Sequence, residues 1–258
     1  MVHHFEMGGW LLFLAFATSV VGSTVGLACT LQSRSALTNG RRIAWLALAA
    51  LAIGGVGIWL MHFIAMLGFA TPGMPVRYDI ARTAFSALLS VSAVFVGLVV
   101  FGVQKEFAVW RLLVAGLITG LAVNLMHYTG MWALNIKGTI GYNPALVLLS
   151  VVIAVVAATA ALWFTAVVDK QSLRLVAAVV MGIAVTGMHY TGMAAVRVQM
   201  DLAAPDPAGV EAFSFLFPVF VLSAAALALP IVAVLTAVPP EEDEATIRAK
   251  AERGQLVG

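Results

Sequence analysis

Three copies of a short motif carry the side chains in this sequence that are best suited to chemistry. The motif reads Met-His-aromatic-x-small-Met, and its copies begin at Met61, Met126 and Met188. Imidazole nitrogen is a ligand for zinc, copper and iron, whereas thioether sulfur selects for copper and above all for Cu(I). Each copy lies inside a long apolar segment, where a titratable ring is costly and indicates a functional site. The three copies therefore predict a copper site.

Helical spacing decides which side chains of a copy point the same way. Residues four positions apart share one face of an α-helix, so each histidine projects together with the second methionine of its copy. The predicted metal ligands are His62, Met66, His127, Met131, His189 and Met193. The first methionine of each copy lies about 100° further round the helix and flanks that face. These methionines and one histidine near the N-terminus are additional candidates: Met61, Met126, Met188 and His4.

A purely structural interpretation of the same residues stays open. Methionine fills irregular gaps in apolar cores, and a buried histidine is often satisfied by a hydrogen bond to a neighbouring helix. Asn124 and Thr186 each precede a motif histidine by three residues. They are candidates either for fixing the histidine tautomer or for a simple hydrogen bond between helices. Three copies favour a binding site, although copies of one duplicated unit are not independent observations.

The composition places the chain in a lipid bilayer. Of its 258 residues, 62% are hydrophobic and 10% are charged, with a mean hydropathy of +1.03, whereas a typical soluble domain has about 25% charged residues. The basic residues are scattered singly, so the net charge of +2 does not indicate nucleic-acid binding. The single cysteine, Cys29, excludes an internal disulfide and a Cys-x-x-Cys metal site. No basic residue precedes the first apolar run, so we expect no cleaved signal peptide.

Seven apolar runs are long enough to cross a bilayer, which takes about 20 residues per helix. We therefore predict an all-α integral membrane protein. Its seven transmembrane helices are expected at Gly8–Leu31, Ile43–Leu67, Ile80–Val103, Trp110–Leu134, Pro144–Val168, Leu173–Val196 and Ala212–Val238. They form one membrane domain, residues 1–238, which is followed by a short charged tail, residues 239–258.

The spacing of the motifs indicates a repeated helix pair. His62 and His127 are 65 residues apart, and His127 and His189 are 62 residues apart. Periods of this length are typical of stacked supersecondary units, and each motif falls near the same end of the second helix of a pair. The helices then form three helix-pair repeats plus one extra helix, the last. The fifth residue of each copy is small, which allows a neighbouring helix to approach closely.

The loop charges set the expected orientation. Ten Lys and Arg residues lie on one side of the predicted helices and four on the other. Because cytoplasmic loops carry the excess of positive charge, we expect the N-terminus outside and the C-terminus in the cytoplasm. The protein would be a multi-pass protein of the cytoplasmic (inner) membrane. The three motif histidines then lie one or two turns below the outer surface.

The stretch from Gly187 to Ala195, Gly-Met-His-Tyr-Thr-Gly-Met-Ala-Ala, resembles the signature of the bacterial MHYT domain, and the resemblance covers nearly the whole chain. It implies an integral membrane sensor of oxygen, carbon monoxide or nitric oxide that acts through bound copper. It also implies that the motif His and Met residues named above are the copper ligands. The first copy departs from the signature, because Phe63 and Ile64 replace Tyr and Thr.

Many members of that family join the membrane unit to a cytoplasmic output domain, such as a diguanylate cyclase, a phosphodiesterase or a kinase. The tail after Val238 is too short to build a core of its own. We therefore expect the signal to pass to a separate cytoplasmic or membrane partner. The lipid bilayer and a small diatomic ligand are the other expected partners.

Two further functions compete with that of a sensor. Copper transport or acquisition would use the same ligands, but a conduction route needs weak sites along its full depth, and Met181 is the only methionine expected deep in the bilayer. A non-catalytic membrane scaffold stays open as well. The sequence shows no nucleophile–base pair and no phosphate-binding loop, so an enzyme is not expected.

The charge asymmetry makes a prediction about topology. A reporter fused after Val257 should be active in the cytoplasm, and one inserted between Met200 and Glu211 should be active outside, because the basic loops are retained inside. Paired alkaline phosphatase and green fluorescent protein fusions measure both positions. A cytoplasmic signal from the Met200–Glu211 insertion would invert the orientation and move the predicted site to the inner face.

Overall fold

The protein is an all-helical membrane bundle. A computed structural model describes residues 9–69, 75–103, 106–201 and 203–237, and within these ranges seven helical spans are long and apolar enough to cross a membrane. The spans are α1 (Trp10–Ser35), a composite of α2 (Asn39–Ala50), η1 (Leu51–Leu60) and α3 (Met61–Met66), α4 (Ile80–Gly102), α5 (Val109–Trp132), α6 (Pro144–Val167), α7 (Gln171–Ala194) and α8 (Ala212–Leu235). The predicted architecture is confirmed, and the predicted helix ends differ from these by no more than about four residues.

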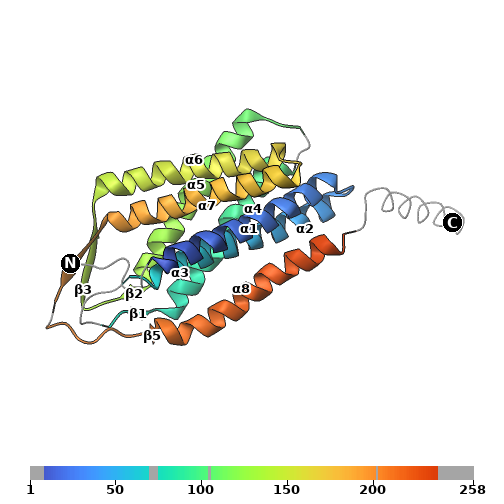
Figure 1. Ribbon diagram of the computed structural model, residues 1–258. Helices are drawn as coiled ribbons and strands as arrows, with labels where there is room; N and C mark the ends of the chain where they lie inside the picture. Colours follow the sequence, from blue (N-terminus) through green and yellow to red (C-terminus); the bar gives the residue numbers. More distant parts are fainter. Residues whose placement is uncertain (1–8, 70–74, 104–105, 202, 238–258) are drawn as a thin grey trace, which may run out of the picture.

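Six of the spans close into a ring. Going round it, α1 packs on η1, η1 on α4, α4 on α5, α5 on α6, α6 on α7, and α7 again on α1. Helices that carry a motif alternate with helices that do not, so we call the Asn39–Met66 span, α5 and α7 the motif helices, and α1, α4 and α6 the spacer helices. The last helix, α8, lies along the outside against η1 and α1 (Figure 1). The arrangement confirms three helix pairs plus one extra helix.

The two ends of the bundle differ in character. At one end, which we call the motif end, α3, α5 and α7 finish and short strands join the connections (Figure 1). The opposite, basic end carries Arg34, Arg41, Arg42, Lys170 and Arg174. Exposed tryptophans occur at both ends, Trp10 and Trp132 at the motif end and Trp110 and Trp163 at the basic end. This placement is typical of aromatic belts at the two surfaces of a bilayer.

The strands at the motif end form two small sheets. In one, β1 (Arg77–Tyr78) lies between β2 (Leu134–Asn135) and β5 (Val210–Glu211). In the other, β3 (Gly138–Tyr142) pairs antiparallel with β4 (Val196–Met200), with Gly138 opposite Met200. Strands of two to five residues are too short to leave an alternating pattern, so the sequence did not predict them. They connect the segments that follow α5 and α7.

Two equivalent contacts set the depth of α5 and α7. The spacer helices begin after the N-cap residues Asp79 and Asn143, whose side chains accept hydrogen bonds from Arg82 N and Ala145 N. The backbone N–H groups of the same two residues donate to Ala133 O and Ala195 O, each over 2.8 Å. Ala133 and Ala195 each lie six residues after a motif histidine. The same local structure therefore holds His127 and His189 at the same level.

The middle of the first motif helix is a π-helix, η1, where the sequence had predicted an ordinary α-helix. It contains Gly54 and Gly57. A Cβ added to Gly22 of α1 would meet the backbone of Gly57, and one added to Gly54 would meet the backbone of Ser90 in α4. Ser90 Oγ also donates to Gly54 O over 2.7 Å. The glycines thus let η1 pack backbone to backbone between two spacer helices.

The caps give a prediction about stability. Replacing Asn143 by Ala removes the side-chain acceptor of Ala145 N, and loss of such an N-cap costs about 1 kcal/mol. We expect the free energy of unfolding, measured by denaturant titration in detergent micelles, to fall by about that amount. Val156→Ala, at an exposed position in the middle of the same helix, is the control and should leave stability nearly unchanged. Equal losses in the two variants would contradict the capping role.

Candidate metal centre

The three motif histidines meet inside the helix ring. His62 comes from α3, His127 from α5 and His189 from α7, and their side chains are 4%, 0% and 1% exposed. His62 Nδ1 lies 3.0 Å from His189 Nδ1 and 3.3 Å from His127 Nδ1. One nitrogen from each ring lies within 4.8 Å of the other two. We call these residues the histidine triad; in the described part of the chain, no Cys, Asp or Glu joins it.

The triad has nearly threefold geometry. The ring centroids are 5.1 Å apart for His62 and His127, 4.9 Å for His62 and His189, and 5.0 Å for His127 and His189. The ring planes are inclined at 76° to 90° to one another. The three histidines occupy equivalent positions because each motif helix lies between two spacer helices in the helix ring. The repeat in the sequence thus becomes a rotational repeat around one point.

The small residue of the motif makes room for a neighbouring ring. A Cβ added to Gly130 of α5 would meet His62 Nε2, and one added to Gly192 of α7 would meet His127 Nε2. Each glycine lies three residues after its own histidine, and it contacts the histidine of the preceding copy. The expected close approach therefore occurs, but between a helix backbone and an imidazole. With Nε2 facing a glycine, Nδ1 is left on the inner side of the ring.

A family comparison bears on this repeated constellation. The family described as bacterial signalling protein N-terminal repeat, MHYT, matches residues 55–116, 120–178 and 182–239. The chain belongs to the MHYT family. Each match begins inside a motif helix, before the motif itself, and extends through the helix that follows. In the ring, by contrast, each pair consists of a spacer helix and the motif helix that comes after it. Both divisions give three repeats and one remaining helix.

Curated relatives are signalling proteins much longer than the matched region. The bifunctional diguanylate cyclase/cyclic di-GMP phosphodiesterase MucR of Pseudomonas aeruginosa is 41% identical over 194 residues, which cover 72% of this chain and 28% of MucR. The cyclic di-GMP phosphodiesterase NbdA of the same organism is 32% identical, with 76% and 25% covered. The signalling protein YkoW of Bacillus subtilis is 31% identical, with 81% and 28% covered. The chain thus spans about a quarter of the length of these relatives. No solved structure matches it.

Polar groups beside the triad tie motif helices to spacer helices. The residues three positions before the motif histidines are, in chain order, Trp59, Asn124 and Thr186. Trp59 Nε1 donates to Ser86 Oγ over 3.0 Å, and Asn124 Nδ2 donates to Ser150 Oγ over 3.1 Å. For Asn124 the structure therefore shows the hydrogen bond between helices that the sequence left open as one alternative. Thr186 Oγ1 is buried and has no hydrogen-bond partner among the described residues.

Sequence reasoning missed the serines of this arrangement. Ser86 lies seven residues after the N-cap Asp79, and Ser150 lies seven residues after the N-cap Asn143. Ser150 Oγ is also 3.0 Å from the hydroxyl oxygen of Tyr128, the tyrosine of the second MHYT copy. An equal offset from equivalent caps was the signal that could have found both serines.

The motif methionines are buried on the same three helices as the triad. Met66, Met131 and Met193, the second methionines, are 2%, 0% and 3% exposed. Met66 lines a small pocket together with His62 and Gly130. The first methionines are equally buried: Met61, Met126 and Met188. Their assignment as ligands stays a prediction, and His4 lies outside the described residues.

A wide pocket lies beyond the triad at the motif end. It has a volume of about 960 Å³, and its lining includes Tyr128 and Met131 of the second motif and Met200 of β4. Lys137 Nζ and Asp206 Oδ1, 2.7 Å apart, lie in the surrounding loops. The hydrogen bond from Lys137 lowers the pKa of the Asp206 carboxyl, which therefore stays charged. The motif end thus offers an open approach, lined in part by polar and charged side chains, that reaches one motif methionine.

The donor set of the triad fits a metal ion. Three nitrogens that each lie ~2.0–2.1 Å from one ion are about 3.3–3.6 Å apart in tetrahedral or trigonal coordination, close to the 3.0 and 3.3 Å between the Nδ1 atoms. Hydrogen bonds between neutral imidazole rings would also account for these two Nδ1–Nδ1 distances. They leave His127 Nε2 without a partner among the described residues. Three neutral donors and no carboxylate suit a cation of low charge in an apolar interior.

The glycine contacts predict an effect on metal binding. Gly192→Ala pushes a methyl group into His127 and should weaken copper binding by about 10-fold or more, the usual effect of disturbing groups that orient ligands. Gly187→Ala is the matched control, because nothing lies within 4 Å of a Cβ at that position of the same helix. Competition titration with a Cu(I) chelator measures both variants. Equal Cu(I) affinities in the two variants would show that the position of the His127 imidazole does not govern copper binding.

Proposed function

We propose that this chain is a membrane sensory module that binds copper at the histidine triad and responds to a small diatomic gas or to redox state. The observation that carries the proposal is the convergence of three buried imidazole nitrogens, with Nδ1 atoms 3.0 and 3.3 Å apart. A buried polar cluster of this kind inside a membrane protein indicates function, because its burial is costly. Bound copper would supply a centre whose ligand set changes when a gas binds or an electron is transferred.

The methionines support copper over zinc in this proposal. Imidazole accepts zinc, copper or iron, whereas thioether favours copper and especially Cu(I). Each histidine has a buried methionine one helical turn further along: Met66, Met131 and Met193. The residues of the chain would hold the ion, exclude bulk water and keep the imidazoles neutral. Zinc loading at the same level would argue against the assignment.

Transport of copper is the second candidate, and one observation favours it. Met188 and Met181 line a cavity that extends from the triad toward the basic end, so thioethers continue inward for two turns. Beyond them the lining consists of apolar side chains and hydroxyl groups, with Leu98, Leu162 and Thr165 among them. A route for an ion needs a series of donors through the whole membrane. The arrangement therefore supports a fixed site better than a path.

The relatives suggest where the signal goes. MucR and NbdA are named for making or degrading cyclic di-GMP, and this chain matches about a quarter of each. We infer that the sensory module controls a cyclic di-GMP enzyme, either a separate cytoplasmic protein or a domain joined to it. With the orientation predicted from the basic loops, that output would face the basic end of the bundle.

Metal analysis tests the proposed cofactor. Purified protein should contain copper, and the double variant His127→Ala/His189→Ala should contain none, because only one imidazole of the triad remains. Elemental analysis by mass spectrometry gives the stoichiometry, and circular dichroism checks that the variant keeps its helices. Unchanged copper in a folded double variant would refute the ligand assignment.

Gas binding separates the sensor from the transporter. The Cu(I)-loaded protein should show a spectral change on addition of carbon monoxide, and His127→Ala should lose it. Cells that lack the protein should keep a normal copper content, because a sensor does not carry the bulk of the metal. Reduced copper uptake together with no response to carbon monoxide would favour transport instead.

A further inference from the structure

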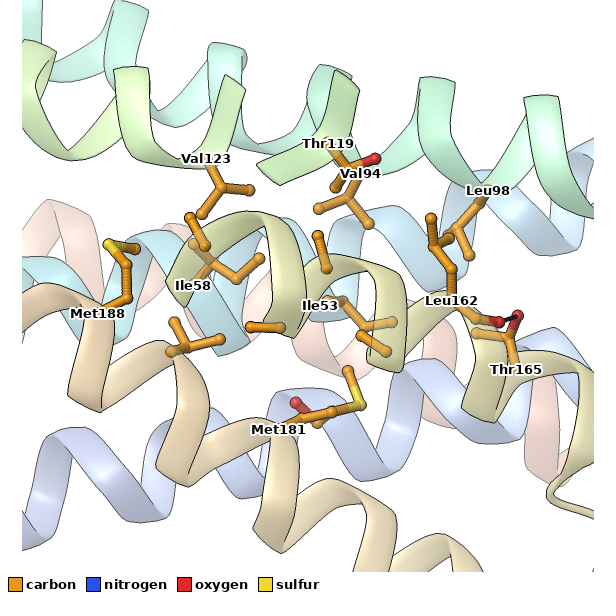
Figure 2. A pocket seen from close by; sticks show the side chains of 16 residues that line it. Ile53, Ile58, Val94, Leu98, Thr119, Val123, Leu162, Thr165, Met181 and Met188 are labelled. Atoms are coloured by element: carbon orange, nitrogen blue, oxygen red, sulfur yellow. Dashed lines mark hydrogen bonds between the residues drawn. The ribbon is translucent and has the colours of Figure 1, made fainter. Parts of the chain in front are cut away.

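We propose that the cavity on the basic-end side of the triad is a binding site for one small, uncharged, apolar molecule of diatomic size. We call it the axial cavity. All six helices of the ring contribute to its lining, and α8 does not. Figure 2 shows side chains from different helices that converge on this space, with Met188 at the left, Met181 below and Thr165 at the right. A space lined by the whole ring lies on its axis.

The axial cavity is aligned with the triad. Ile58, Val123 and Val185 line it, and each lies four residues before a motif histidine. Residues four apart share a helix face about one turn apart, so the cavity begins one turn, roughly 5 Å, from the histidines. Met188, which directly precedes His189, also lines it. A molecule in the cavity therefore faces the triad from the side opposite the open pocket of the motif end.

The cavity exists because one spacer helix contributes small side chains. Ala154, Ala157, Ala158 and Ala161 of α6 all lie in its lining. Its volume is about 50 Å³, whereas one water molecule requires ~10–15 Å³ by the same measure. The space holds a diatomic molecule or a xenon atom but is far too small for a lipid acyl chain.

The lining does not suit water. Ser23, Thr119 and Thr165 are the residues of the lining that carry a hydroxyl group. Thr165 Oγ1 already donates to Leu162 O over 2.6 Å (Figure 2). Thr119 Oγ1 packs against Gly97 of α4 and has no hydrogen-bond partner among the described residues, so it could offer a water one partner. A buried water needs two to four polar partners, and apolar cavities without them stay dry and take up xenon or other apolar molecules. The occupant is therefore apolar and uncharged.

The proposed role rests on the proposed function in one respect, the identity of the occupant. If copper at the triad binds a gas, the axial cavity is the place from which an apolar gas dissolved in the bilayer reaches the metal. Binding of an apolar atom to the cavity itself needs neither copper nor a gas response. The two proposals are therefore tested separately.

The test uses xenon as the probe. Copper-free full-length protein in lipid nanodiscs should give a ¹²⁹Xe saturation-transfer signal that differs from that of xenon dissolved in empty nanodiscs. Ala158→Leu, which fills the cavity, should reduce the signal to that of the empty nanodiscs. Ala228→Leu is the matched control at an exposed position of α8 and should retain the signal. Ala161→Val fills the cavity more mildly and replaces Ala158→Leu if that variant does not fold.

The outcomes decide the proposal. No protein-dependent xenon signal, or an undiminished signal in folded cavity-filling variants, would overturn it. In copper-loaded protein, Ala158→Leu should slow carbon monoxide association several-fold at unchanged copper content, and an unchanged rate would overturn the role in supplying the triad. If the protein binds no copper, the proposed function fails while the xenon result still decides the cavity.

Discussion

Burial of three imidazoles at one point in an apolar bundle is the constraint on which the rest of the structure depends. A polar ring placed in lipid or in an apolar core without a partner is strongly unfavourable. His62, His127 and His189 satisfy one another or a common ion only when their Nδ1 atoms meet, as they do at 3.0 and 3.3 Å. Convergence requires three helices that approach one axis at the same depth. The ring of alternating motif and spacer helices supplies both.

The sequence was sufficient to predict the transmembrane helices and their pairing. Apolar runs of transmembrane length predicted the seven spans, and the near-equal spacing of the histidines predicted the helix pairs. The offset of four between His127 and Met131 predicted one shared face but not the direction in which an imidazole turns. That direction depends on the neighbouring helix, since Gly192 receives His127 Nε2 and leaves Nδ1 toward the axis. A contact between copies cannot be read from a single copy.

Other features escaped prediction because their signals are short or depend on distant residues. The strands at the motif end have two to five residues, which is below the length at which alternation is visible. The axial cavity depends on the absence of side-chain volume at Ala154 and Ala158 of α6, across the ring from η1, which is distant in the sequence. Alanine in a membrane helix otherwise indicates close packing. Only the assembled ring shows that these alanines face a space.

The first copy of the motif shows how the constraint acts on an irregular sequence. His62 is residue 24 of the Asn39–Met66 span, whereas His127 and His189 are each residue 19 of α5 and α7. An uninterrupted α-helix with five more residues would place its histidine at a different depth and angle from the other two. The π-helix η1 uses more residues per turn, and its glycines allow the wider coil to pack directly on α1 and α4. His62 is nevertheless the ring whose Nδ1 contacts both partners. The position of the histidine is therefore kept while the backbone that carries it departs from regular geometry, so the triad, and not the helix, is what the fold preserves.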